Sequence, residues 1–319
     1  MTNAHVLNTL PELERAGITI FERGWLSSNN ILIQGMDGPS ALVDSGYVSH
    51  ADQTLNLVRT ALKDHPLDLL LNTHLHSDHC GGNALLQSAY PRLRTMIPPG
   101  LAPSVSDWDP VALTFEPTGQ SCAPFSFQDL LRPGSTLQLG SLHWEVHAAE
   151  GHDPHSVILF QPQVRVLISA DALWENGFGV VFPELEGLDA FQDVANTLDM
   201  IERLAPLTVI PGHGSVFQDV PTALSKARSR LAGFVDNPSK HKRHALKVLL
   251  KFKLLEWQQI HRSELIKWCL HTPYITHLAN EGNSTPLSPE GLSAFLVPLL
   301  KELERSGALR LEEDFVFNS

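Results

Sequence analysis

The stretch NTHLHSDHCGGN, residues 72–83, places four side chains that can bind a metal within six residues. These side chains are His74, His76, Asp78 and His79. In an extended loop His74 and His76 point to the same side, because side chains alternate with a period of two. After a tight turn, Asp78 and His79 can face a second centre nearby. Since imidazole nitrogen and carboxylate oxygen are preferred ligands of zinc and similar ions, the stretch predicts part of a two-metal site.

Two metal ions need roughly seven or eight protein ligands, so other segments must contribute. Three further candidates follow apolar runs: His152 in AEGHDPHS, Asp171 in LISADALW and His213 in VIPGHGS. An unpaired carboxylate at the end of a buried strand would be costly, which makes Asp171 the most informative of the three. All three positions lie at expected strand ends or in the adjacent loops, where an α/β scaffold builds a site.

The first 235 residues alternate between short apolar runs and amphipathic segments, a pattern typical of an α/β fold. The run LDLLLNT before the histidine-rich stretch predicts a strand buried on both faces. GLDAFQDVANTLDMIERLA predicts an amphipathic helix. Residues 98–135 are rich in Pro, Gly and Ser and lack a clear period, so we expect a long surface excursion there.

The order His-x-His-x-Asp-His followed by separated His, Asp and His resembles the metallo-β-lactamase superfamily over roughly residues 15–235. The resemblance implies an αββα sandwich with the site at one edge. It implies that one metal is held by His74, His76 and His152. It implies that the other is held by Asp78, His79 and His213, with Asp171 as the bridge. Asp44, in LVDSG, would then be a partner that fixes the tautomer of a ligand.

The same resemblance implies a hydrolase in which a hydroxide between two divalent ions attacks the substrate. Asp78 and Asp171 are the expected catalytic carboxylates, with Asp78 or a neighbouring water returning a proton. Zinc is the default metal, and iron and manganese suit the same ligands. The family pattern PGHTPG is EGHDPH here, so the substrate class does not carry over. Trp174, Phe178 and Phe182 follow the bridging carboxylate and either line an apolar pocket or belong to the core.

The composition changes near VDNPSKHKR, which predicts a catalytic domain over residues 1–235 and a second domain over 236–319. Three expected helices and a terminal hairpin predict a small winged-helix module. Ser263 is an expected helix N-cap, and Ser288 followed by Pro289 is an expected helix start. The domain order resembles the β-lactamase-like protein 2 branch of the superfamily, whose human-type members are associated with cleavage of single-stranded RNA.

The expected substrate is a small ester, thioester or lactone, and a single-stranded RNA endonuclease is the alternative. Residues 226–267 carry eleven Lys and Arg against three acidic residues, within a chain of net charge −12. This segment either holds RNA or forms a solvated helix face whose lysine stems cover apolar surface. A DNA-binding regulator is a third interpretation, disfavoured because the expected recognition helices are apolar and acidic.

Three widely spaced cysteines, Cys80, Cys122 and Cys269, argue against a disulfide framework and for a cytoplasmic location. Cys80 is expected to be a small packing residue. No signal peptide is recognisable, and no apolar run reaches the roughly 18 residues of a membrane span. The expected partners are therefore a small-molecule substrate, RNA as the alternative, and a second copy of the chain through exposed C-terminal aromatics; no membrane is expected.

Overall fold

The computed structural model describes residues 5–7, 10–63, 65–281 and 285–319. These residues divide into two compact units. The first unit comprises residues 1–113 and 122–232, and the second comprises residues 114–121 and 233–319. A short strap, residues 114–121, thus belongs to the second unit. The chain then returns to the first unit and enters the second unit again at residue 233.

A seven-stranded sheet forms one half of the first unit, with its strands in chain order. Pairs from β1 to β4 are antiparallel, and pairs from β4 to β7 are parallel. The strands are β1 (His5–Leu7), β2 (Ile18–Glu22), β3 (Asn30–Ile33), β4 (Ala41–Val43), β5 (Leu69–Leu71), β6 (Arg94–Ile97) and β7 (Asp129–Leu130).

A five-stranded sheet in the order β12-β11-β10-β9-β8 forms the other half. Only the β11–β12 pair is parallel among these neighbours. The strands are β8 (Thr136–Leu139), β9 (Leu142–Ala148), β10 (Val157–Gln161), β11 (Val166–Ala170) and β12 (Thr208–Pro211). The strands expected from the apolar runs are confirmed, whereas β1, β6, β7 and β8 were not predicted.

Alternate residues of the strands face two separate cores. Ile31 and Ile33 of β3 belong to a cluster that also contains residues of β9 to β12, so this core lies between the sheets. The residue between them, Leu32, packs instead with Val58 and other residues of the helix above the sheet. Because neighbouring side chains of a strand point to opposite faces, a run of apolar residues fills both layers.

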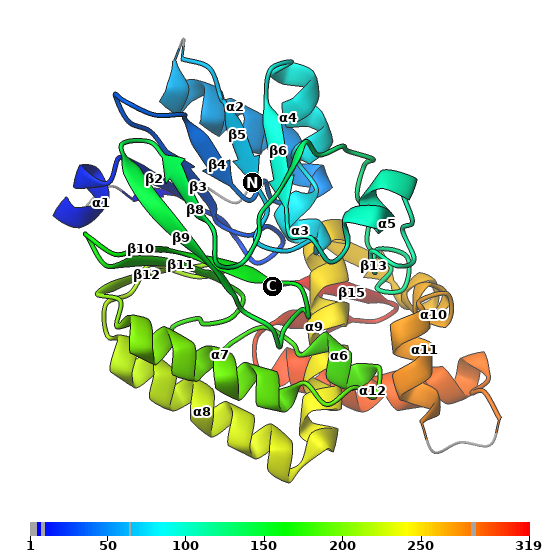
Figure 1. Ribbon diagram of the computed structural model, residues 1–319. Helices are drawn as coiled ribbons and strands as arrows, with labels where there is room; N and C mark the ends of the chain where they lie inside the picture. The colour runs from blue at the N-terminus through cyan, green and yellow to red at the C-terminus, as the bar shows by residue number, and fades with distance from the viewer. Residues whose placement is uncertain (1–4, 8–9, 64, 282–284) are drawn as a thin grey trace. The chain divides into compact units, whose positions relative to one another are not determined.

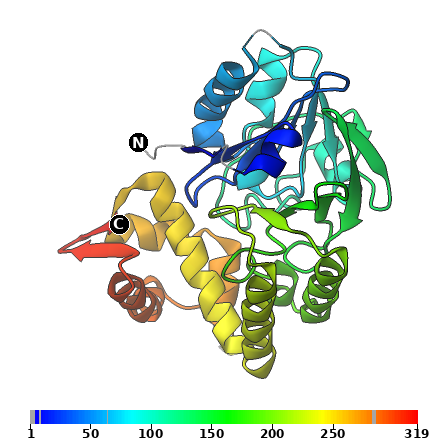
Figure 2. The ribbon, with the colours of Figure 1, turned by 90° about the vertical axis from the view of Figure 1, so that its left-hand side faces the viewer.

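Helices cover the outer faces of the sheets. Figures 1 and 2 show α2 and α4 on the outer face of the seven-stranded sheet, and α7 beyond the five-stranded sheet. The helix predicted within residues 187–205 is α7. The helices of the first unit and its boundary are α1 (Pro11–Arg15), η1 (Val48–His50), α2 (Ala51–Leu62), α3 (Ser77–Cys80), α4 (Asn83–Ala89), α5 (Ala102–Asp107), α6 (Phe182–Leu185), α7 (Phe191–Leu204) and α8 (Val220–Asp236).

Residues 98–135 differ from the expected surface excursion. The segment contains α5 and β7, and Leu113, Phe125 and Leu131 within it are buried. Periodicity failed to reveal this, because the buried side chains are separated by turns rather than carried on one long element. The segment is therefore partly core, with exposed turns between its anchors.

The second unit consists of four helices and a three-stranded sheet in the order β13-β15-β14. Ser288 caps α12 by accepting a hydrogen bond from Gly291 N, at the helix start that the sequence predicted, and Gly307 follows the helix with a φ of 74°. Ser263 is not an N-cap, because α10 begins at Arg262 and Ser263 already lies inside it. The N-cap is His261, whose side chain accepts a hydrogen bond from Ser263 N. Helix α11 was not predicted. The elements are α9 (Pro238–Trp257), β13 (Gln259–His261), α10 (Arg262–Leu270), α11 (Pro273–Asn280), α12 (Pro289–Arg305), β14 (Leu309–Glu312) and β15 (Phe315–Asn318). Figure 2 shows the terminal hairpin, in red, beside α12.

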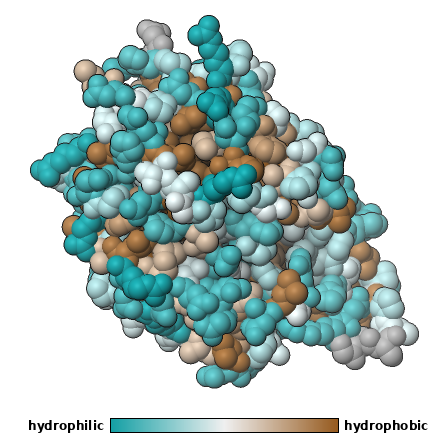
Figure 3. All heavy atoms as spheres, in the orientation of Figure 1, coloured by the Kyte–Doolittle hydropathy of each residue, from teal (hydrophilic) through white to brown (hydrophobic). Residues whose placement is uncertain are grey.

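The face drawn in Figure 3 is mainly hydrophilic, with hydrophobic residues distributed among the polar ones. Among the described helices, none combines the length and the apolar composition that a bilayer crossing requires. The apolar content of the chain is instead used in the layers described above, where side chains of β3, β4, β10 and β11 are fully buried.

Replacing Leu159 tests the core between the sheets. Leu159 lies in β10 and is 0% exposed. We expect Leu159→Ala to lower the free energy of unfolding by about 2–5 kcal/mol, because the deletion leaves a cavity that the sheets cannot close. Chemical denaturation measures this loss. Val111→Ala is the matched control, since Val111 is 56% exposed and its truncation should change stability little; equal losses would contradict the layered core.

Candidate metal centre

The seven candidate ligands converge at one edge of the two sheets. The loop after β5 and the short helix α3 carry His74, His76, Asp78 and His79. The other three follow strands of the second sheet: His152 lies between β9 and β10, Asp171 directly follows β11, and His213 follows β12. Their side chains form three overlapping groups whose ligand atoms lie within 4.8 Å of one another. Strand ends thus bring together residues up to 139 positions apart in the chain.

The first group consists of His74, His76 and His152. His76 Nδ1 lies 3.1 Å from His74 Nε2 and 2.9 Å from His152 Nε2. Three imidazole nitrogens that converge in this way match the faces of a tetrahedral site, in which ligand atoms lie about 3.3 Å apart when bonds are near 2.0–2.1 Å. The group is suited to hold one divalent ion.

The second group consists of Asp78, His79 and His213. His213 Nε2 lies 3.0 Å and His79 Nε2 lies 3.9 Å from Asp78 Oδ2. Asp171 lies between the groups, because its Oδ2 is 3.4 Å from His152 Nε2 and its Oδ1 is 3.5 Å from His79 Nε2. A third group, His74 with His79 and Asp171, overlaps both and fits a carboxylate shared between two ions.

One observation tests whether these residues fit metal ions. His79 Nε2 is fully buried, points to Asp78 and Asp171, and has no hydrogen-bond partner among the described residues. A buried imidazole nitrogen without a partner is costly unless another group satisfies it. A divalent ion between His79, Asp78 and His213 would satisfy this nitrogen, so these residues fit a divalent metal ion.

The fold gives Asp171 its position through a local irregularity. The register between β11 and β12 shifts between Ile168 and Ala170, and Ala170 has a φ of 46°. A bulge of this kind re-aims the next side chain, and a non-glycine residue in this conformation stores strain that often marks a functional site. Gly212 leaves space for the Asp171 side chain, because a Cβ at position 212 would lie 2.2 Å from Asp171 Oδ1.

Hydrogen bonds on the far side of each ring fix which nitrogen faces the centre. His79 Nδ1 donates to Asp44 Oδ2 over 2.8 Å, and His152 Nδ1 donates to the Val180 carbonyl over 2.5 Å. The Thr73 amide and hydroxyl also donate to Asp44, over 2.9 and 2.8 Å. The placement expected for Asp44 is thus confirmed, and these contacts leave Nε2 of both rings available to an ion.

Two residues near the centre were not singled out from the sequence. Asp153 Oδ2 lies 3.8 Å from His76 Nε2, on the side of the ring opposite the converging nitrogens. Trp25 stacks on His213 with ring centroids 5.3 Å apart and planes 8° apart. The aspartate after His152, where the family pattern has threonine, was the available signal for Asp153. Trp25 had none, because it stands in a loop without a period.

The aromatic residues after Asp171 lie in different places, one in the core and two beside the candidate ligands. Phe178 is 1% exposed and belongs to the core. Phe182 lies edge-on to His76, with centroids 5.0 Å apart, and Trp174 lies edge-on to His213 at 5.6 Å. Trp174 Nε1 also donates to Asp171 Oδ1 over 3.2 Å. His155 stands outside the three ligand groups, and its ring packs against Gly100.

Burial and mutual charge shift the pKa values of these groups in opposite directions. Burial lowers the pKa of His76 to about 4, with a contribution from His152, and burial lowers the pKa of His74 well below its usual value. Burial alone would also lower the pKa of His79, but Asp44, Asp171 and Asp78 raise it well above the usual value. Burial opposes ionisation of Asp171, yet His213 and His79 hold its pKa well below the ordinary range.

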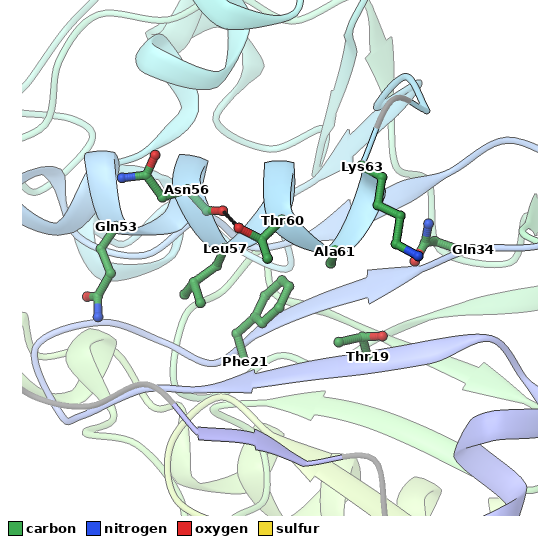
Figure 4. Close-up of a pocket in the computed structure, with 9 residues that line it drawn as sticks. All are labelled: Thr19, Phe21, Gln34, Gln53, Asn56, Leu57, Thr60, Ala61 and Lys63. Atoms are coloured by element: carbon green, nitrogen blue, oxygen red, sulfur yellow. Dashed lines mark hydrogen bonds between the residues drawn. The ribbon is translucent and has the colours of Figure 1, made fainter.

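A separate groove lies on the first unit, between α2 and strands β2 and β3 (Figure 4). It has a volume of about 720 Å³ and contains none of the seven candidate ligands. Its lining side chains are Thr19, Phe21, Gln34, Gln53, Asn56, Leu57, Thr60, Ala61 and Lys63. Its lining residues include neither a metal-ligand cluster nor a nucleophile paired with a base, so the strand ends offer the stronger candidate site.

A family model described as the metallo-beta-lactamase superfamily matches residues 23–213. The match covers more than half of the chain and includes all seven candidate ligands. The chain belongs to the metallo-beta-lactamase superfamily, whose members are generally metal-dependent hydrolases. Among curated proteins, none matches the chain.

Solved structures share the fold at low sequence identity. A beta-lactamase domain protein from Burkholderia ambifaria is 20% identical with a TM-score of 0.58, and the match covers 98% of this chain and 94% of that one. A metallo-beta-lactamase family protein from Thermus thermophilus is 20% identical with a TM-score of 0.54, over 95% and 99%. A class B3 di-zinc metallo-beta-lactamase from an Alaskan soil metagenome is 20% identical with a TM-score of 0.52, over 68% and 91%. The first two matches therefore extend over the second unit as well.

Asp44 provides a test of the contacts behind the ligands. We expect Asp44→Asn to weaken metal binding about 10- to 100-fold, because the variant removes the charge and one acceptor behind His79. Competition with a chromogenic chelator measures the affinity. Asp107→Asn, at an exposed carboxylate in α5, is the matched control and should bind metal like the wild type. Unchanged affinity in the Asp44 variant would contradict the positioning role.

The opposite pKa shifts of His76 and His79 predict different pH dependences for the two ions. His76 carries no proton above about pH 5, whereas His79 must release one when a metal binds. Binding of an ion at His79 should therefore strengthen as the pH rises above the ordinary range of histidine, by up to about tenfold per unit, whereas His76 should add no pH dependence above about pH 5. Calorimetry in buffers of different ionisation enthalpy reports the released proton. Equal slopes for both ions would contradict the assignment.

Proposed function

We propose that the chain is a dinuclear metal-dependent hydrolase of a small ester, thioester or lactone. The observation that carries the proposal is the unpartnered, buried His79 Nε2 within two ligand groups joined by Asp171. His74, His76 and His152 would hold one ion, and Asp78, His79 and His213 the other. Two bound ions would supply Lewis acidity and lower the pKa of a water molecule between them.

The side chains assign complementary tasks to the two carboxylates. Asp171 faces both groups with different oxygens and would fix their separation. Asp78 is more accessible, with 14% of its side chain exposed against 7% for Asp171. The oxygen of Asp78 that does not hold the ion would therefore be the one that returns a proton to a leaving group at the open side of the centre. The contacts around Asp44 hold the motif loop still during this transfer.

Aromatic side chains on two sides of the centre support an uncharged carbonyl substrate. Phe182 borders the first ligand group, and Trp25 with Trp174 borders the second. Trp25 is 54% exposed, so its surface is available to an acyl chain or ring. In the described part of the chain, the contacts of the seven candidate ligands include no lysine or arginine, the side chains that usually bind a phosphate.

The basic segment gives little support to the RNA endonuclease alternative. Arg243 and Lys247 pair with Glu302, and Lys242 pairs with Glu281, all within the second unit. Lys251 donates to Asn318 Oδ1 over 2.5 Å and to the Ser319 carbonyl over 3.0 Å. Side chains held in such contacts would have to be released before they could bind phosphates, which lowers their contribution to RNA affinity. Helix α9 therefore uses its positive charge mainly to hold its own unit together.

The proposal assigns the second unit to a winged-helix-like module that starts near residue 236. The order helix, strand, helices and terminal hairpin, with β15 between β13 and β14, supports this assignment. Much of the positive charge of α9 is held in the contacts described above. A structural or oligomerisation role therefore suits this module better than nucleic-acid binding.

A substrate panel with a bridge variant tests the proposal. We expect metal-loaded wild type to hydrolyse at least one of an aryl ester, an acyl thioester and a lactone, and to leave labelled single-stranded RNA intact. Asp171→Ala should lose metal and at least about a hundredfold of the activity, because the variant removes a shared ligand. Asp107→Ala is the matched control.

Three outcomes would contradict the proposal. Cleavage of RNA by the wild type and not by Asp171→Ala would establish phosphodiester hydrolysis instead. Two ions retained in Asp171→Ala would overturn the bridging role. Background turnover throughout the panel by fully metal-loaded protein would remove the proposed substrate class.

A further inference from the structure

Two free thiols meet beside the metal-binding motif. Cys80 Sγ and Cys122 Sγ lie 3.9 Å apart, although 42 positions separate them in the chain. Neither cysteine is in a disulfide, and both belong to the first unit. A disulfide requires sulfur atoms about 2.05 Å apart, so an approach of about 2 Å would join this pair. The third cysteine, Cys269, is buried in α10 of the second unit.

Cys80 is the fixed member of the pair. It is the last residue of α3, is 0% exposed and directly follows His79. The backbone of α3 is held from several sides: Ser45 N donates to the His79 carbonyl over 2.7 Å, and Ser28 N donates to the Asp78 carbonyl over 3.0 Å. A movement of α3 by about 2 Å would break these contacts, so α3 stays in place when the sulfur atoms approach.

Cys122 is the member that can move and that a small oxidant reaches first. It is partly exposed and lies in residues 120–127, a stretch without helix or strand. The strap, residues 114–121, belongs to the second unit. Cys122 directly follows the strap and is the first residue that belongs to the first unit again.

The strap is anchored in that second unit. The Tyr274 amide donates to the Pro117 carbonyl over 3.1 Å. Gly119 has a φ of 67°, and a Cβ there would lie 2.6 Å from Trp268 Nε1. Cys122 therefore begins the segment through which the chain returns from an anchored strap to the first unit.

We propose that Cys80 and Cys122 are a modification site at which a reversible disulfide joins the metal-binding motif to this returning segment. With hydrogen peroxide as oxidant, Cys122 Sγ attacks one peroxide oxygen, an S–O bond forms, the O–O bond breaks and the leaving hydroxide takes up the thiol proton as water. Cys80 Sγ then attacks Cys122 Sγ. The S–S bond forms, the S–O bond breaks, and hydroxide leaves with the Cys80 proton as a second water. The two thiols lose two electrons, and the peroxide gains them.

The disulfide has a consequence for the metal centre. Asp78 and His79 immediately precede Cys80, so local opening of α3 is one route by which a metal ion would leave. A covalent link from Cys80 to the returning segment restrains that opening. The oxidised protein should therefore release metal to a chelator several-fold more slowly than the reduced protein. This consequence rests on the ligand assignment, whereas formation of the disulfide does not depend on the proposed function.

Differential alkylation of the full-length protein tests the site. The protein is treated with hydrogen peroxide, its free thiols are alkylated, and the digest is examined by mass spectrometry. We expect a Cys80–Cys122 linked peptide that lacks two hydrogens and that a thiol reductant separates, with Cys269 alkylated as before. Cys122→Ser should abolish the linked peptide, and Cys269→Ser should retain it.

The contrary results are equally specific. Separate alkylation of Cys80 and Cys122 after oxidation, or links only between different chains, would overturn the proposal. Metal release at an unchanged rate from protein shown to carry the disulfide would overturn the restraint on α3. Since neither measurement uses a substrate, failure of this proposal is distinguishable from failure of the proposed hydrolase.

Discussion

The burial of imidazole and carboxylate groups at one sheet edge is the constraint on which the first unit depends. Charges and polar groups removed from water are costly unless other groups compensate them. Two of the rings have a hydrogen-bond partner behind them, Asp44 for His79 and the Val180 carbonyl for His152, whereas His213 Nδ1 has none among the described residues. The ring nitrogens that point to the centre face mainly other candidate ligands, and His79 Nε2 has no hydrogen-bond partner among the described residues. Divalent ions at this centre would complete the arrangement and would explain why so many titratable groups are buried together.

The two sheets supply the rigidity that such a centre needs. The core between them is filled from both sides, with Ile33 and Val43 from one sheet and Leu159 and Ile168 from the other. Ligands placed at the ends of these strands inherit their positions from a packed interior, which holds a site more accurately than free loops do. The bulge before Asp171 and the bare backbone at Gly212 then make the final adjustments. Local strain is thus concentrated beside the groups that would do the chemistry.

The sequence predicted the positions of the candidate ligands better than it predicted their surroundings. Each candidate ligand stands in a short motif next to an apolar run, so its placement at a strand end followed from pattern alone. Asp153 stands beside His152 but was not singled out. Trp25 and Cys122 lack such a context, because their importance comes from residues far away in the chain. The same reason explains the partly buried segment 98–135 and helix α11, whose anchoring side chains are spread over turns or lie in a short element. The basic segment shows the opposite case, because a charge pattern suggested a binding surface while its lysines and arginines pair with acids of the second unit.

By itself, the sequence determined the superfamily, the alternation of strands and helices and the set of residues able to hold two metals. These features are encoded locally, in hydrophobic period and in the spacing of His and Asp along short motifs. Only the tertiary structure decided which nitrogen of each ring faces the centre, which oxygen of Asp171 faces each ligand group and that Trp25 covers His213. It also brought Cys80 to Cys122. Such features depend on distances between segments that the chain separates widely, and those distances are set by packing of the sheets rather than by any local preference.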